Sequence, residues 1–191
     1  MLLDKFLPSA VVTASHLFRR ANSDIVKDVL GFDDIDDWKN GLLLFSPIEK
    51  AFDEFRLGFV YDNSDDTYRL RLFDTTAEFR ETSIIEYIPE VLREKLDLSS
   101  TAPDGILHFT SYPDTELDLR TTFADLEGMP IAFKNLNRPF RRCLNLQARI
   151  AFIQATEVQG AVDVPDFEDF WSEGMREDDL LQRYFNSMAS S

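Results

Sequence analysis

The sequence contains very few of the residues on which several kinds of functional site depend. Its 191 residues include one cysteine and two histidines. A single cysteine cannot form an intramolecular disulfide, and it fits a reducing compartment. The sequence also has no C-x-x-C pair and no glycine-rich phosphate loop. These absences exclude zinc fingers and P-loop nucleotide hydrolases.

Segments that would direct the chain to a membrane are missing as well. No apolar run reaches the length of about eighteen residues that a membrane-spanning helix needs, so we expect no membrane partner. Residues 1–8 lack the basic start and the long apolar stretch of a secretory signal, so we expect no signal peptide here.

Basic residues are outnumbered, and the 20 Lys and Arg against 35 Asp and Glu give a net charge of −15. A uniformly acidic surface repels nucleic acids, because affinity for phosphate comes largely from Lys and Arg. The basic residues are clustered, however, and residues 130–156 contain no acid. This allows a segregated basic face. The arginines that we expect to contact phosphate are Arg19, Arg20, Arg138, Arg141, Arg142 and Arg149.

The length, a hydrophobic content of 44% and 17 phenylalanines indicate one compact domain with an aromatic core. Apolar periodicity and turn residues predict both strands and helices, and therefore an α+β fold. The predicted strands are 9–15, 42–45, 57–62, 67–74 and 106–111. The predicted helical segments are 24–30, 47–55, 89–96, 121–126, 139–157, about 167–171 and 177–188.

Residues 14–53 are the most informative part of the chain. His16 ends one apolar strand, and Asn40-Gly41 forms a tight turn before the next. The helix that follows carries Glu49 and Asp53, which share a face because they are four residues apart. Two carboxylates and a facing imidazole could hold a divalent cation and activate a water molecule.

This stretch resembles the core of HNH-type nucleases, also called the ββα-metal fold. The pattern is A/S-H-I/L, then N-G-L-L-L, then I-H/E-x-x-F-D, and it is carried by His16, Asn40 and Glu49. It is most similar to the variant in fungal and oomycete proteins, including the nuclease-like domains of Crinkler effectors. A weaker resemblance to the C-terminal helix of the Crinkler-type proteins covers residues 138–149.

The resemblance implies a role for each matching residue. His16 would be the general base, and its imidazole suits that task because its ordinary pKa lies near neutral pH. Asn40 would tie down the loop that orients His16. Glu49, in place of the family's final histidine, would bind Mg²⁺ or Mn²⁺, with Asp53 as a second acid. Ser15 departs from the family, since many HNH enzymes have an acidic metal ligand there.

Each of these residues also has an ordinary structural interpretation. Glu49 fits a capping box in which Ser46 caps the helix and Pro47 begins it. Asparagine before glycine suits any tight turn. Asp53 fits an exposed helix position, a single histidine after a strand is often structural, and the arginines fit a solvated helix face.

Three other features have a structural interpretation. Four aspartates in residues 32–39 do not have EF-hand spacing, so we expect a solvated loop held by Phe32, Ile35 and Trp38. His108 lies in an expected strand, and we interpret it as structural. Cys143 has no partner histidine in a familiar pattern, which argues against a cysteine nucleophile.

The sequence therefore predicts an α+β fold with a ββα-metal (HNH-like) core, an added β-hairpin and C-terminal helices. Residues 1–160 would form the nuclease domain, and residues 161–191 an acidic helical extension packed on it. The expected function is metal-dependent hydrolysis of DNA, in a cell-death-inducing effector acting in a host nucleus, or otherwise in the cytoplasm. The alternative is a degenerate HNH-fold effector or adaptor that binds a protein partner or DNA without cutting.

Overall fold

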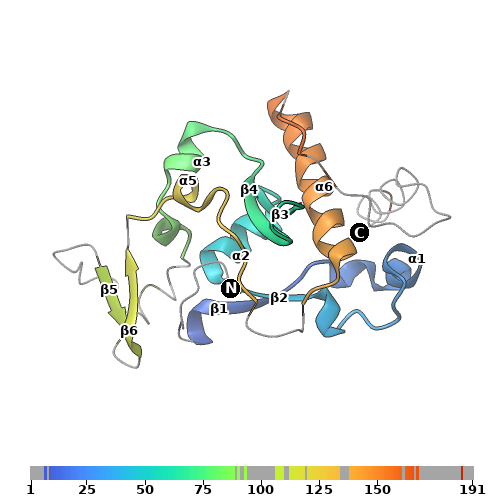
Figure 1. Cartoon of the computed structure of the whole chain (residues 1–191), viewed down its shortest axis with the longest axis horizontal. Helices are drawn as coiled ribbons and strands as arrows, with labels where there is room; N and C mark the ends of the chain where they lie inside the picture. Colours follow the sequence, from blue (N-terminus) through green and yellow to red (C-terminus); the bar gives the residue numbers. More distant parts are fainter. Residues whose placement is uncertain are drawn as a thin grey trace.

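The computed structural model describes residues 7, 9–88, 90, 93, 106–109, 112–118, 120–133, 138–160, 162–165, 167 and 186. Within these residues the strands form three separate two-stranded antiparallel sheets, and helices pack against the first two. Figure 1 shows strands β1 and β2 side by side at the centre, with helix α2 above them. The mixture of strands and helices agrees with the predicted α+β class.

The first sheet and the helix that follows it form a ββα unit. Strand β1 (Val12–His16) pairs with β2 (Gly41–Phe45), and His16 lies opposite Gly41 in the register. Helix α2 (Ser46–Asp53) begins immediately after β2, with Pro47 in its first turn, where a missing N–H costs nothing. The predicted second strand and the following helix are confirmed. The predicted first strand begins later, because Ser9–Val11 forms a 3-10 turn.

Between the two strands the chain makes a long excursion. It contains the 3-10 helix η2 (Arg20–Ile25), helix α1 (Val26–Leu30) and the short 3-10 helix η3 (Trp38–Asn40). The predicted end of this helix at Gly31 is confirmed. Gly31 has a φ of +78°, a left-handed conformation that ends a helix and that glycine adopts without strain. Phe32 and Ile35 pack against the core as expected. Trp38 is 53% exposed, so it does not anchor the loop as predicted.

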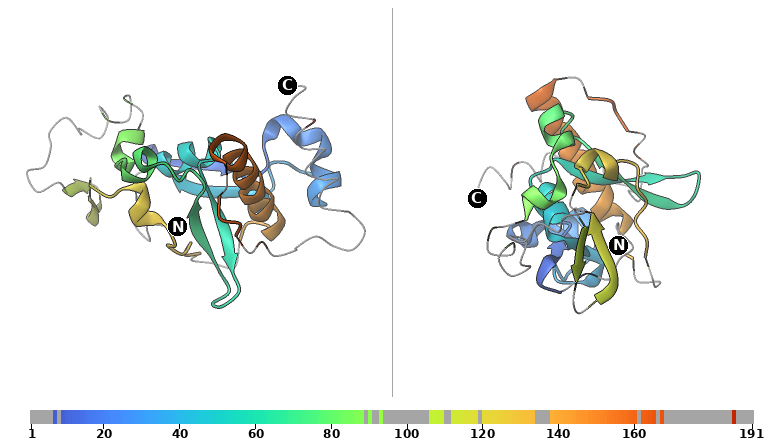
Figure 2. Two further views of the ribbon diagram at one scale, coloured as in Figure 1. Left: turned by 90° about the horizontal axis from the view of Figure 1, so that it is seen from above. Right: turned by 90° about the vertical axis from the view of Figure 1, so that its left-hand side faces the viewer.

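A second hairpin and the longest helix lie on the other side of α2. Strand β3 (Leu57–Asp62) pairs with β4 (Thr67–Leu72), close to the predicted positions. Figure 2 shows this hairpin projecting from the body of the molecule beside helix α6 (Arg141–Gln159). Helix α6 packs against β3. It begins at Arg141 rather than at Pro139, so Arg138 precedes the helix and does not share its face.

The remaining elements are short. Helix α5 (Phe123–Leu126) packs against β4 and against helix α3 (Ala77–Glu81), and the 3-10 helix η4 (Ile84–Tyr87) packs against α2. Thr122 and Asp125 form a capping box on α5. Strands β5 (Ile106–Phe109) and β6 (Tyr112–Asp118) form a third hairpin. Strand β6 was not predicted. Most of the helices predicted over 89–96, 167–171 and 177–188, and most of the proposed extension 161–191, lie outside the described residues.

The core is rich in phenylalanine, as the composition indicated. Six phenylalanines are almost completely buried, and the rings of Phe79 and Phe123 stack with their centroids 4.4 Å apart. Helix α2 contributes Ile48, Ala51 and Phe52 to the same core. Glu49 and Asp53 lie on the opposite side of the helix, away from the apolar interior. The core therefore fixes the direction in which the two carboxylates point.

Candidate functional site

The site is built on the ββα unit, and Asn40 holds its strand ends together. The Asn40 side chain is fully buried, and its Oδ1 accepts a hydrogen bond of 2.7 Å from the backbone N–H of Phe18. Its Nδ2 donates to the carbonyl oxygens of Phe18, at 3.0 Å, and of Ile35, at 2.9 Å. Asn40 thus ties the segment after His16 to the loop before β2. This geometry fits a positioning role and not a chemical one.

His16 lies at the end of β1 and faces the loop 32–37. Its Nε2 is 2.9 Å from Oδ1 of Asp36, and its side chain is 35% exposed. Arg20 Nη2 is 3.1 Å from the other oxygen of Asp36. In the part of the chain that the structure describes, His16 makes no second side-chain hydrogen bond. The imidazole is therefore held on one nitrogen and open to solvent.

Glu49 and Asp53 lie in contact on one face of α2. Loss of water raises the pKa of Glu49, and the charge of Asp53 and a hydrogen bond to it raise that pKa further. The pKa of Asp53 is also raised by loss of water, although Arg19, Ser15 and Glu49 partly offset this effect. The two carboxyls therefore share one electrostatic site, which favours a bound proton or a cation.

Ser15 faces the same site from the neighbouring strand. It is only 4% exposed, and its Oγ forms no hydrogen bond of normal geometry within the described residues. It is nevertheless close enough to the carboxyl of Asp53 to lower that group's pKa. A buried hydroxyl without a partner is costly. The position next to His16 thus places a hydroxyl group beside the acidic pair.

The predicted capping role of Glu49 is wrong. Phe45 occupies the cap position of α2, and no side chain forms a hydrogen bond to this end of the helix. Ser46 is the first residue of the helix, which places Glu49 one position too late for a capping box. The Glu49 carboxyl is directed instead towards Asp53.

The described residues contain no group of three or more His, Cys, Asp or Glu side chains suited to hold a metal ion. His16 therefore does not join Glu49 and Asp53 in a three-ligand cluster. Ser15 lies beside the carboxyl of Asp53, whereas the His16 side chain contacts Asp36 in the loop 32–37. The site therefore offers two carboxylates and one hydroxyl together, and a separate imidazole at the end of β1.

The six arginines do not form one open face. Arg19 donates to the backbone oxygen of Asp53 at 2.7 Å and lies 4.5 Å from the ring centre of Phe55. Arg20 is paired with Asp36. The remaining four lie at the start of α6 or along it. Arg138 is exposed, Arg141 is paired with Asp66 at 3.0 Å, Arg142 lies over Phe140, and Arg149 lies over Phe167.

The other candidate nucleophiles and ligands lie away from this site or are closed to it. Cys143 is buried in α6, and burial raises the pKa of its thiol to about 12. A reactive thiolate is therefore not available near neutral pH. His108 belongs to β5, and its side chain lies outside the described part of the structure. Among the described residues no helix is long and apolar enough to cross a membrane.

The comparison with protein families agrees with this geometry. The model of the HNH endonuclease family HNH_2 matches residues 3–60, that is 58 of the 191 residues. The matched stretch contains β1, β2 and α2, and so His16, Asn40 and Glu49. No curated protein and no solved structure matches the chain. These findings support an HNH-like domain at the N-terminal end of this sequence, and with it nuclease activity and nucleic-acid binding in general.

Proposed function

We propose that this protein is a metal-dependent endonuclease of the HNH type that hydrolyses phosphodiester bonds in DNA. The observation that carries the proposal is the acidic pair Glu49–Asp53 on α2, next to the strand that ends in His16. The family match over residues 3–60 supports the same assignment. The proposal assigns to each of these residues a separate task.

The acidic pair fits a small divalent cation. Mg²⁺ and Mn²⁺ prefer oxygen ligands, and Mg²⁺ is commonly held by one or two carboxylates together with water and substrate phosphate. Glu49 and Asp53 would hold the ion, and the buried Oγ of Ser15 offers a further oxygen. Loss of water raises the pKa of both carboxyls, and Arg19 offsets this only in part for Asp53. When bound, the cation would stabilise negative charge on the scissile phosphate.

The protein's own groups would do the remaining work. His16 accepts the proton of the water molecule that attacks phosphorus, and Asn40 keeps the segment that carries it in place. Arg19, which donates to the backbone oxygen of Asp53, lies beside the acidic pair and would contact the DNA backbone. We propose five further phosphate contacts, Arg20, Arg138, Arg141, Arg142 and Arg149. To bind phosphate, each side chain would have to leave its present carboxylate or aromatic partner.

The test is plasmid nicking in Mg²⁺ or Mn²⁺ with the wild type, His16→Ala and Glu49→Ala. Removal of a general base typically slows a reaction by about 10²–10⁴-fold, so both variants should lose nearly all cutting, and EDTA should stop the wild type. Glu81→Gln, a change of one exposed helical carboxylate, is the control that should cut normally. Circular dichroism checks folding. Cutting that survives His16→Ala would refute the assignment.

The alternative is a protein that keeps the HNH-like fold but binds a protein partner or DNA without cutting. The net charge of −15 and the serine at position 15, where many HNH enzymes have an acid, favour it. DNA binding that weakens steeply with salt is expected for a nuclease making several phosphate contacts. A folded wild type that neither binds DNA at low salt nor nicks it would make this alternative the better account.

The resemblance to Crinkler effectors suggests a biological setting for the proposed activity. A secreted effector of this type would act on DNA in a host nucleus, and the resulting damage would cause cell death. This part of the proposal rests on the sequence resemblance alone. Localisation of a tagged protein in host cells, with His16→Ala as the inactive control, tests both the compartment and the dependence of cell death on cutting.

A further inference from the structure

We propose that Asp36 is a positioning residue that fixes the ring orientation and the tautomer of His16. The inference deepens the proposed nuclease function and rests on it. Asp36 lies 20 residues after His16, in a loop whose four aspartates suggested only a solvated surface. The contact between the two side chains shows that one of these aspartates has a specific partner in the site.

The contact is made by one oxygen of Asp36, and the other oxygen is also occupied. Oδ1 lies 2.9 Å from Nε2 of His16, and Oδ2 accepts a hydrogen bond of 3.1 Å from Arg20. With Arg20 on one side, the carboxylate plane is set so that Oδ1 faces the ring. Both partners are only half-exposed, with side-chain exposures of 35% for His16 and 49% for Asp36.

The loop is built to hold Asp36 at this place. Its backbone N–H donates to Oδ1 of Asp34 at 2.9 Å, which closes a tight turn. The residue before it, Ile35, is held by the bond from Nδ2 of Asn40 to its carbonyl oxygen. Asn40 also holds Phe18, two residues after His16. The buried amide of Asn40 therefore holds both the segment after His16 and the residue before Asp36.

This geometry has a direct chemical consequence. A carboxylate only accepts hydrogen bonds, so neutral His16 must carry its proton on Nε2. The lone pair is then on Nδ1, which is the nitrogen that would accept the proton of the attacking water. Nε2 keeps its own proton throughout, and Asp36 stays ionised. The imidazolium formed in this step lies against a negative charge, which stabilises it.

The test compares Asp36→Asn with Asp33→Asn, a matched change of one aspartate in the same loop. Asp33 is paired with Lys27 and not with His16, so the control should behave as wild type. Long-range ¹H–¹⁵N correlation at a fixed, mildly alkaline pH reads the tautomer, and His108→Gln identifies the His16 signals. We expect a single Nε2–H form in the wild type. In Asp36→Asn, whose amide can also donate, we expect shifts that indicate a mixture.

The same variants are compared in steady-state cutting assays. Loss of a group that orients a functional histidine typically costs about 10–100-fold, so kcat should fall by that factor in Asp36→Asn. KM for DNA and the affinity for Mn²⁺ should stay within about twofold, because Asp36 is not a member of the acidic pair. Asp36→Glu keeps the carboxylate and should restore the tautomer and part of kcat. This recovery would show that the loss in Asp36→Asn comes from the missing carboxylate and not from misfolding.

Failure of this inference and failure of the nuclease proposal would give different results. Unchanged ¹⁵N shifts of His16, or an unchanged kcat in an active Asp36→Asn, would overturn the inference and leave the nuclease proposal standing. A folded wild type that never cuts would overturn the nuclease proposal, and with it the catalytic meaning of the contact. The tautomer measurement needs no activity, so the contact itself is decided in either case.

Discussion

Asn40 and Phe18 exchange two hydrogen bonds through one side chain. Oδ1 of Asn40 accepts from the N–H of Phe18 at 2.7 Å, and Nδ2 donates to its carbonyl oxygen at 3.0 Å. Phe18 is itself only 1% exposed, so neither of its backbone groups can turn to water instead. The exchange continues the pairing of β1 with β2 beyond His16, although no strand is present there. It holds the segment that follows His16 against the residue that precedes β2.

Substitution of Asn40 by alanine should therefore be severe. The two buried backbone groups of Phe18 and the half-buried carbonyl of Ile35 would lose their hydrogen bonds to Asn40, at about 1–3 kcal/mol each, so we expect a loss of about 3–5 kcal/mol in the free energy of unfolding. Asn40→Asp keeps the acceptor but should cost at least as much, because its second carboxylate oxygen would face the carbonyl oxygens of Phe18 and Ile35 in a fully buried place. Urea denaturation measures both, and Asn63→Ala in the exposed hairpin turn should change stability by less than about 0.5 kcal/mol. A mild Asn40→Ala would mean that the loop is held by other contacts.

The acidic pair should make stability depend on pH and on metal. The folded pKa values of Glu49 and Asp53 are raised, so the folded chain binds more protons than the unfolded chain between the ordinary and the raised values. Stability in EDTA should thus fall as the pH rises through this window and stay lowered at neutral pH.

Glu49→Gln removes part of this cost, so in EDTA at pH 7 its Tm should exceed that of the wild type. Mn²⁺ should raise the Tm of the wild type but not that of the variant, whose affinity for the ion should be at least about 10-fold weaker. Thermal melts and calorimetric titration provide the two readings. Glu81→Gln, with the same change of charge, should follow the wild type. Equal Tm values with and without Mn²⁺ in the wild type would count against a metal site here.

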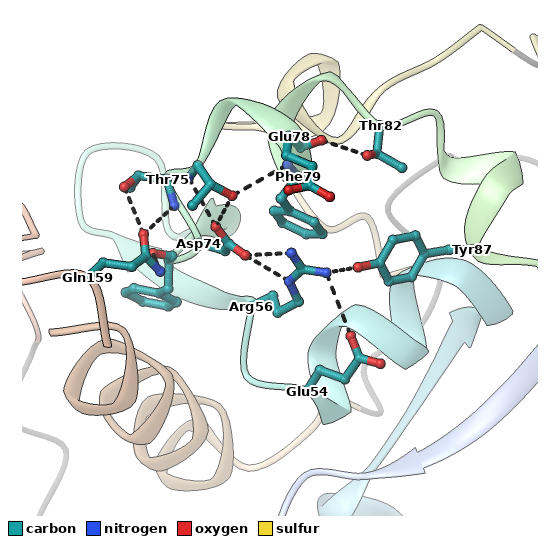
Figure 3. A network of polar contacts seen from close by, with 11 residues as sticks. Glu54, Arg56, Asp74, Thr75, Glu78, Phe79, Thr82, Tyr87 and Gln159 are labelled. Atoms are coloured by element: carbon teal, nitrogen blue, oxygen red, sulfur yellow. Dashed lines mark hydrogen bonds and ion pairs between the residues drawn. The ribbon is translucent and has the colours of Figure 1, made fainter. Parts of the chain in front are cut away.

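Arg56 anchors the end of α2 to the elements around β4 (Figure 3). Its guanidinium lies 4.0 Å from the ring centre of Phe79, and its Nη2 is 2.6 Å from Oδ2 of Asp74. It also donates to the hydroxyl of Tyr87. Burial opposes ionisation of Asp74, but hydrogen bonds from Thr76 and Arg56 outweigh it, and the pKa of Asp74 lies below its ordinary value.

Arg56→Met should lower the free energy of unfolding by about 2–3 kcal/mol, because it leaves the carboxylate of Asp74 without its cation. The contribution of Asp74 is present above its ordinary pKa of 3.8 and is lost as the pH falls through the lowered value, so Asp74→Asn should flatten the acid side of the stability curve. Arg120→Met, which breaks an exposed pair with Asp118, should cost less than about 1 kcal/mol. Equal losses in both arginine variants would contradict this interpretation.

At Gly58, β3 lies close against α6. A Cβ atom there would lie 3.0 Å from Oε1 of Gln147 and 3.0 Å from the ring of Phe73, with the backbone of Ala148 at 3.2 Å. Gly58→Ala should cost about 1–3 kcal/mol through overpacking. Gly41→Ala, whose nearest contact would be 3.5 Å away, should be tolerated, and chemical denaturation compares the two. A neutral Gly58→Ala would show that α6 can shift away from β3.

Local patterns were sufficient for much of the fold near the site. The Asn-Gly turn, the apolar strand after it and the proline in the first helical turn predicted β2 and α2, because each depends on neighbouring residues alone. The resemblance selected His16, Asn40 and Glu49, and the structure places them in one ββα unit. Prediction of the start of α6 failed by two residues, because Pro139 is equally compatible with the extended segment that precedes Arg141.

By itself the sequence determined the aromatic core and the strand and helix around the Asn-Gly turn, since these follow from composition, periodicity and spacing along the chain. The candidate residues came from its resemblance to HNH nucleases. Only the tertiary structure decided how the charges are paired. It brought Asp36 to His16 across 20 residues and Asp66 to Arg141 across 75. It also turned Ser15 and Glu49 towards Asp53. Such pairs depend on where the core places each segment. The sequence around a charged residue does not indicate which distant residue it will contact.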